Sequence, residues 1–297
     1  MSNAIWPSEP RQVEQTHAPA NGRRPNAGLL QLVLRSVGTR TVIADCYAHV
    51  PLQVLRPVYL DDSGTAYIYL LNPGGGVVGG DTYTMQITLE AAARAYLTTP
   101  SATRLYAAPE TPAQQHIDIS LDAGAVLTYL PEQTIPFAEA AFHQYLDIRL
   151  GPGASVFLGD IVAPGRLARG EKFAYREYCS RVRIIDVHGT VMVVDHYRLQ
   201  PRRHNLAALG RLEGYAYLGT FYAVCQGTIL PSALVEQLHA LLAEQRSLVG
   251  SVTLLAHGGV AARLLGEDHG SVSQALFDLW RTLYQHLYGG IAVPHRT

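Results

Sequence analysis

Between about residues 80 and 160 the chain repeats one pattern: an alternating strand, a turn of small residues, and an apolar strand. The alternating strands are residues 82–90, 116–121 and 144–150, and the small-residue turns are residues 91–95, 122–125 and 151–154. Alternation with period two is typical of a β-strand with one buried face. The unit recurs about every 30 residues, and repeated strand units stack into extended sandwiches or helical β-solenoids.

The remaining folded sequence extends this prediction to a fold class. Residues 181–187 and 191–195 flank His188-Gly189-Thr190, which is a hairpin signal, and residues 251–255 fit one more strand near the C-terminus. Residues 232–246 and 271–287 carry apolar stripes at helical spacing, the second with Ser271 as N-cap and Gly289 as stop. We therefore expect a mainly β fold, with many short strands in a helical, solenoid-like β arrangement and about two C-terminal α-helices.

Composition sets the domain organisation and excludes several classes of function. Residues 1–26 are polar, with four prolines and no periodicity, and predict a disordered leader. Residues 27–297 predict a single domain whose helices occupy about 231–290. The net charge of −1 gives no indication of the basic surface that nucleic-acid binding requires. Three well-separated cysteines, no apolar run of about 18 residues and no secretory signal predict a cytoplasmic protein without a membrane span.

The densest local signal is the glycine run of residues 72–81, Asn-Pro-Gly-Gly-Gly-Val-Val-Gly-Gly-Asp. It contains the spacing G-x-G-x-x-G, but a dinucleotide site needs a helix after the glycines. Residues 82–90 alternate as a strand instead, which excludes that site. We expect a tight corner between strands at Leu71 and Thr82, with Asp81 as the residue at its exit that carries chemistry.

Three later segments are rich in functional side chains: residues 98–106, residues 129–137, and residues 159–171, which we expect to form a glycine-bounded loop that includes Asp160. Their hydroxyls, carboxylates and arginines fit internal ion pairs and turn networks. Carboxylates on one solenoid face also fit the acid pair of a glycosidase. No nucleophile elbow and no H-E-x-x-H motif is present.

These segments, in this order, resemble the UreD (also called UreH) family of urease accessory proteins over roughly residues 28–290. The match rests on 72–76 with 79–81, on 98–106, on 129–137, and on 163–166 with 169–171. The resemblance implies a largely β fold with helically wound strands and a few C-terminal helices. It also implies a non-enzymatic chaperone that binds urease apoprotein and the helical accessory protein UreF. With the GTPase UreG, such proteins help to deliver nickel to urease. The resemblance thus implies no tightly bound cofactor in this chain, with nickel only in transit.

The matched motifs supply candidate site residues, none of them catalytic. We expect Asp81, Glu132 and Glu171 to line a polar nickel path or its mouth, because oxygen ligands release Ni²⁺ more readily than a full imidazole or thiolate set. The structural alternative pairs these acids with arginines that hold the loops. The supporting or partner-facing candidates are Arg104, Tyr106, Arg166, Arg169 and Trp280. The edge of the helix at 271–288 is the candidate surface for a UreF-like partner.

Two other classes of function stay open on the residues alone. One is a carbohydrate-active β-solenoid enzyme that uses paired carboxylates. The other is a purely structural scaffold that never meets metal.

Overall fold

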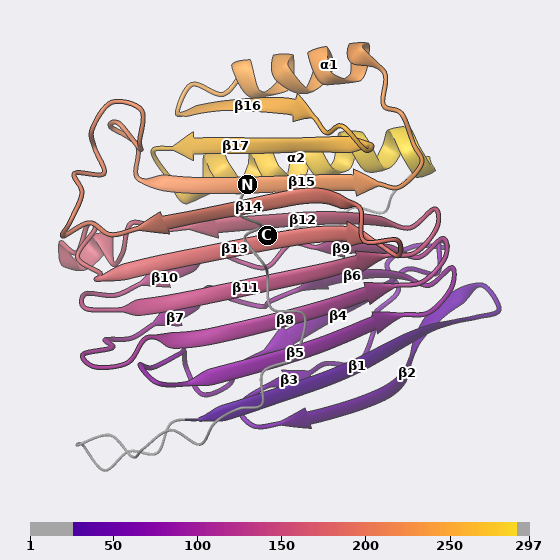
Figure 1. Ribbon diagram of the computed structural model, residues 1–297, viewed down its shortest axis with the longest axis horizontal. Coiled ribbons are helices and arrows are strands. Elements are labelled where there is room, and N and C mark those ends of the chain that lie inside the picture. Colours follow the sequence, from indigo (N-terminus) through magenta and orange to yellow (C-terminus); the bar gives the residue numbers. More distant parts are fainter. Residues whose placement is uncertain (1–25, 290–297) are drawn as a thin grey trace, which may run out of the picture.

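The computed structural model describes residues 26–289 of the chain as two β-sheets with two helices against one of them (Figure 1). The seven-stranded sheet has the order β14-β13-β11-β8-β5-β1-β2. Its strands are β1 (Ala27–Val37), β2 (Arg40–His49), β5 (Thr82–Leu89), β8 (Ala113–Leu121), β11 (Ala141–Leu150), β13 (Glu177–Asp186) and β14 (Val191–Leu199).

The ten-stranded sheet has the order β16-β17-β15-β12-β9-β6-β4-β3, with β7 and β10 beside it. Its strands are β3 (Gln53–Val54), β4 (Ala66–Leu71), β6 (Arg94–Thr98), β7 (Thr103–Leu105), β9 (Val126–Tyr129), β10 (Thr134–Pro136), β12 (Ser155–Val162), β15 (Tyr217–Cys225), β16 (Leu248–Leu254) and β17 (Gly259–Gly266). The helices are α1 (Ser232–Ala243), α2 (His269–Tyr288) and the short 3-10 helix η1 (Leu167–Arg169).

The middle of the chain coils by alternating between the two sheets, and this confirms the predicted fold class. Strands β5, β8, β11 and β13 lie parallel in one sheet, while β4, β6, β9 and β12 lie parallel in the other. Leu89, Leu121 and Leu150 occupy the same register position in successive turns of the coil. The sequence repeat is therefore one turn of the solenoid.

The small-residue turns stack on one another because they connect equivalent strands of successive coils. Ala92 N–H donates to the carbonyl of Ala123 at 2.9 Å, and Gly124 N–H donates to the carbonyl of Pro152 at 2.9 Å. Ala93, Ala125 and Ala154 are fully buried at the ends of these turns, so packing explains the alanines. Gly124 and Gly153 have φ of +67° and +68°, and a Cβ there would meet nothing within 4 Å, so backbone conformation explains these glycines.

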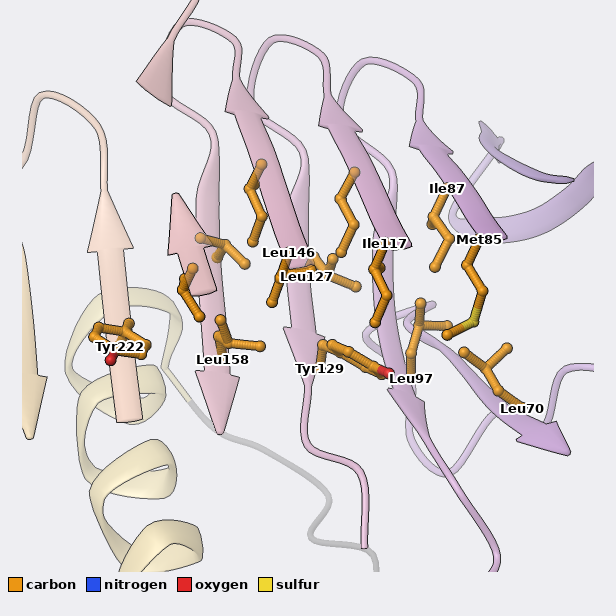
Figure 2. Close-up of a cluster of buried hydrophobic side chains, with 14 of the residues drawn as sticks. Leu70, Met85, Ile87, Leu97, Ile117, Leu127, Tyr129, Leu146, Leu158 and Tyr222 are labelled. Carbon is orange, nitrogen blue, oxygen red and sulfur yellow. The ribbon is translucent and has the colours of Figure 1, made fainter. Parts of the chain in front are cut away.

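The core fills the space between the sheets. Strand β5 is buried at every second residue, at Tyr83, Met85, Ile87 and Leu89. Figure 2 shows such side chains from both sheets pointing into the same space, with Tyr129 and Tyr222 among the aliphatic residues. Period-two alternation therefore produces one continuous core.

The two helices lie on the outer face of the ten-stranded sheet, so β12 and β15 are buried on both faces. In α2, Val272, Leu276 and Trp280 belong to the core shared with this sheet. The predicted N-cap at Ser271 is wrong. The cap is Asp268, whose carboxylate accepts from the Ser271 N–H at 2.9 Å, and Gly289 ends the helix as predicted.

The predicted hairpin around Gly189 and the C-terminal strand are present as β13–β14 and β16. Two strands, β15 and β17, were not anticipated. Strand β15 is buried at eight of its nine residues, so it lacks the alternation that identifies a half-buried strand.

The predicted leader lies, apart from Asn26, outside the described residues. Within residues 26–289, neither helix has the combination of length and apolar composition that a membrane span needs.

Candidate functional site

A cavity of about 280 Å³ lies between the two sheets. Three of the segments that carry the family resemblance contribute to its wall, through residues 72–77, 99–104 and 129–134. It extends past β12 as far as Thr220 and Tyr222 on β15. Segments that are about 20 to 25 residues apart in the sequence thus converge on one site, because each occupies the same edge of successive coils.

The glycine run forms the corner between β4 and β5, as predicted. The Val77 N–H donates to the Arg104 carbonyl at 2.8 Å, and the Tyr106 N–H donates to the Val77 carbonyl at 2.7 Å. A Cβ on Gly76 would lie 2.4 Å from the Arg104 carbonyl oxygen. The run is therefore poor in side chains because its backbone lies directly against the β7 segment.

Inward-facing polar side chains form a row on each sheet, at the same register in successive strands. On the seven-stranded sheet the row is Tyr83, Gln115, Gln144, Ser180 and Tyr197. On the ten-stranded sheet it is Asp160, Thr220 and Arg263. Tyr197 Oη donates to Asp160 Oδ2 at 3.1 Å and joins the two rows. The core is consequently polar along one line across the strands.

Asp160 is the carboxylate deepest in this site. Protein surrounds it, yet it faces the cavity, which leaves part of its surface accessible. Burial raises the pKa of Asp160, while hydrogen bonds from Tyr197, Tyr178 and the Ile161 N–H act in the opposite direction. Burial, reinforced by the Asp160 carboxylate, raises the pKa values of Tyr178 and Tyr197, so their hydroxyls remain donors. Sequence reasoning placed Asp160 in a loop, which is wrong, since it lies in β12.

Of the three predicted acids, Glu132 lines the cavity. Its carboxylate lies 3.7 Å from Nε2 of His269, at the start of α2, and its backbone N–H donates to Thr99 Oγ1 at 2.9 Å. Asp81 and Glu171 are not among the lining residues. The structure therefore does not gather the three acids at one point.

Asp81 and Glu171 instead hold backbone and loop groups in place. Asp81 is 1% exposed, and its carboxylate accepts from the N–H groups of Asn26 and Val78 at 2.9 and 3.0 Å and from Tyr83 Oη at 3.1 Å. Glu171 forms a bidentate ion pair with Arg166 and accepts a hydrogen bond from the Ala138 N–H at 3.1 Å. The hydrogen bonds from Arg166 lower the pKa of Glu171.

The predicted supporting residues fall into three places. Arg104 lines the cavity. Tyr106 and Arg166 both pack on Phe137, with the Tyr106 ring centroid at 5.0 Å and the Arg166 guanidinium at 4.1 Å. Arg169 ends η1 on the surface.

Trp280 is 1% exposed and donates through Nε1 to Thr128 Oγ1 at 2.9 Å. Its ring thus supports the packing of α2 on the sheet.

Sequence reasoning missed Asp160, Gln115 and Gln144 as site residues. A signal was present: Gln115 lies two residues before Ile117, and Gln144 lies two residues before Leu146, in the phase of the buried face. A polar residue in the buried phase of two successive repeats indicates an internal polar site. Among residues 26–289, no three histidine, cysteine, aspartate or glutamate side chains gather closely enough to hold a metal ion.

Comparison with known proteins supplies the family. The sequence model described as "UreD urease accessory protein" matches residues 26–297. The chain belongs to the UreD family. It is 35% identical to the urease accessory protein UreD of Actinomyces naeslundii, over 88% of this chain and 95% of that one. It is 34% identical to UreD of Cenarchaeum symbiosum, over 86% of this chain and 90% of that one. UreD of Herpetosiphon aurantiacus is 36% identical, over 88% and 91%. The resemblance inferred from the four segments is thereby confirmed, and three of these UreD segments meet at the cavity.

Proposed function

We propose that this UreD protein is a nickel-delivery component of urease maturation and that the cavity is part of the route that Ni²⁺ takes. It acts without catalysis, in the cytoplasm, together with UreF-like and UreG-like accessory proteins and urease apoprotein. The observation that carries the proposal is the convergence of three family segments on a cavity that also contains Glu132 and Asp160. The relatives described above bear the name of a urease accessory protein, which supports the maturation role.

The chemistry of the cavity wall suits a cation that must move on. Its polar groups are carboxylates, hydroxyls and amides, from residues such as Glu132, Asp160, Thr134 and Gln144, together with the guanidinium of Arg104. Oxygen ligands bind first-row divalent cations less tightly than imidazole or thiolate ligands do. A cation in this cavity would therefore be held by weak, exchangeable contacts, which is what delivery requires.

Asp160 also gives the route a means of charge balance. Because burial raises its pKa, the carboxyl group holds a proton more readily than an exposed aspartate does. A divalent cation beside it would favour the carboxylate and displace that proton. Tyr178 and Tyr197 would continue to donate to the carboxylate, which keeps it oriented toward the cavity.

The test is reconstituted activation of urease apoprotein with nickel, the accessory proteins and variants of this chain. We expect Glu132→Gln and Asp160→Asn to lower the activation rate about tenfold, the lower end of the effect of losing a supporting group at a metal site. Glu110→Gln is the matched control, because Glu110 is an exposed acid that does not line the cavity. Binding of the partners to each variant is measured in parallel and should match the wild type.

The predicted path residues Asp81 and Glu171 need separate variants, because each holds backbone N–H groups whose loss would disturb a loop. Wild-type activation by both cavity variants, with normal partner binding, would show that the route does not use this cavity. Partner binding by a complex that takes up no nickel in a titration would instead favour a structural scaffold. Turnover of a polysaccharide by the isolated protein would favour the carbohydrate-active alternative.

A further inference from the structure

The longest irregular connection among the described residues is the segment 200–216, which joins β14 to β15. In Figure 1 it is the orange loop that projects at the left of the molecule, beyond the ends of the strands. Compact domains rarely keep a connection of more than about 12–15 residues without secondary structure unless it has a function. Leu209, in the middle of this segment, is 92% exposed.

This segment and the last strands enclose a second pocket, of about 570 Å³, which we call the end pocket. Its apolar wall is formed by Leu199, Leu206, Leu212, Leu218, Val249 and Leu265. Its basic wall residues are Arg198, His204, Arg211 and Arg263, and no aspartate or glutamate of the described chain lines it. The end pocket thus combines an apolar floor with a basic rim.

The arginines of the rim differ in how their charge is balanced. Arg198 pairs with Glu177 at 2.8 Å, and Arg263 pairs with Asp195 at 2.5 Å. Arg211 donates to the backbone carbonyl of Asn205 at 3.2 Å and has no carboxylate partner among residues 26–289. Its positive charge therefore remains available beside the apolar floor.

The end pocket is separated from the internal cavity by polar groups that face both spaces. Tyr222 lines the cavity and hydrogen-bonds Asp195, while Arg263 lines the end pocket and bonds the same carboxylate. The Arg263 guanidinium also lies 5.5 Å from the centre of the Tyr197 ring. A cation in the end pocket would meet Arg263 and Arg211, so the ligand that fits this pocket carries a negative charge.

We propose that the end pocket binds a segment of a protein partner in which a carboxylate stands beside a large apolar side chain. The apolar side chain occupies the leucine-lined floor, and the carboxylate bonds the guanidinium of Arg211, which suits two parallel hydrogen bonds. Leu209 extends the apolar contact onto the exposed loop. This inference rests on the proposed function, because that function supplies the partners: the UreF-like protein, the UreG-like protein and urease apoprotein.

The test measures the affinity of the full-length protein for each of these three purified partners at low and moderate salt. We expect Arg211→Glu to weaken binding of at least one partner about tenfold, and that interaction to weaken with rising salt in the wild type. Leu209→Ser, which removes an exposed apolar group, should weaken the same interaction. Arg56→Glu is the matched control, since it makes the same charge change on an exposed residue after β3, at the opposite edge of the sheet. It should stay within about twofold of the wild type.

Thermal unfolding of each variant shows whether the fold is intact. If Arg211→Glu and Leu209→Ser bind every partner as the wild type does, the end pocket is not a docking site, while the delivery function stands. If the wild type binds none of the three partners, the proposed function fails and the docking site fails with it. A wild-type dimer that Arg211→Glu converts to monomer would assign the pocket to a second copy of the chain and overturn the proposal.

Discussion

Three alanine substitutions in the glycine run separate the two causes of lost stability, which are steric clash of an added Cβ and strain of a positive φ. Gly75 has φ +81°, and a Cβ added there would meet nothing within 4 Å, so Gly75→Ala introduces conformational strain alone. Gly79 has no positive φ, but its Cβ would lie 2.6 Å from Ala108 Cα, so Gly79→Ala introduces a clash alone. Gly76 combines φ +146° with a Cβ position 2.4 Å from the Arg104 carbonyl oxygen.

The expected losses in unfolding free energy follow from these differences. Strain at Gly75 costs about 1–2 kcal/mol, and the stiffer unfolded chain offsets about half of it, which leaves about 1 kcal/mol. The clash at Gly79 costs about 1–3 kcal/mol, as overpacking does in a filled interior. Gly76→Ala carries both effects and should cost about 4 kcal/mol. In that variant the β7 backbone must move or the Val77–Arg104 hydrogen bond must break.

Equilibrium urea unfolding, followed by circular dichroism and tryptophan fluorescence together, measures the three values. Coincident transitions are required so that a two-state free energy is defined. The reasoning is refuted if Gly75→Ala destabilises as much as Gly76→Ala, or if Gly79→Ala matches the wild type. Either result would mean that the backbones of residues 72–81 and 103–108 are not in the close contact that forms this wall of the cavity.

Two further predictions concern the core. Trp280→Phe removes the hydrogen bond from Nε1 to Thr128 Oγ1 and should lower the unfolding free energy by about 1–3 kcal/mol; a cycle with Thr128→Val should show coupling, and additive effects would contradict the bond. Asp160→Asn should change the pH dependence of stability. Because the pKa of Asp160 is raised in the folded state, the contribution of Asp160 to stability is greatest below the unfolded pKa of aspartate and declines as pH rises through the folded value. Unfolding free energies measured from about pH 4 to pH 8 should decline less in the variant, and parallel profiles would count against a buried, titrating Asp160.

The solenoid could be predicted from the sequence because its signal is local. The alternation within each strand predicts which face is buried, and the small residues at 91–95, 122–125 and 151–154 predict where the coil turns. Strand β15 escaped prediction because helices cover its second face, and burial on both faces removes the alternation. Strand β17 alternates in burial, but both of its faces carry mostly small or apolar residues, so the alternation is not visible in the sequence.

The site was only partly predictable, since it depends on register between strands. Glu132 could be singled out from its segment, whereas Asp160 was misplaced because Gly159 beside it suggests a loop. In the structure Gly159 lies in β12, where a Cβ would come within 2.6 Å of Leu130 Cδ2. The glycine marks close packing between strands, and no single-segment rule distinguishes that use from a turn.

The coil itself explains why a polar line can exist inside an otherwise apolar core. In a parallel solenoid each turn adds one residue at every register level, so a level occupied by Gln115 and Gln144 becomes a row that runs along the coil. A buried amide isolated in an apolar core is costly, whereas Gln115 and Gln144 both line the same polar cavity. The row ends where antiparallel strands β14, β15 and β17 replace the repeat and bring Tyr197 and Arg263 together. The same change of topology therefore ends the polar row of the cavity and places the basic end pocket beyond it.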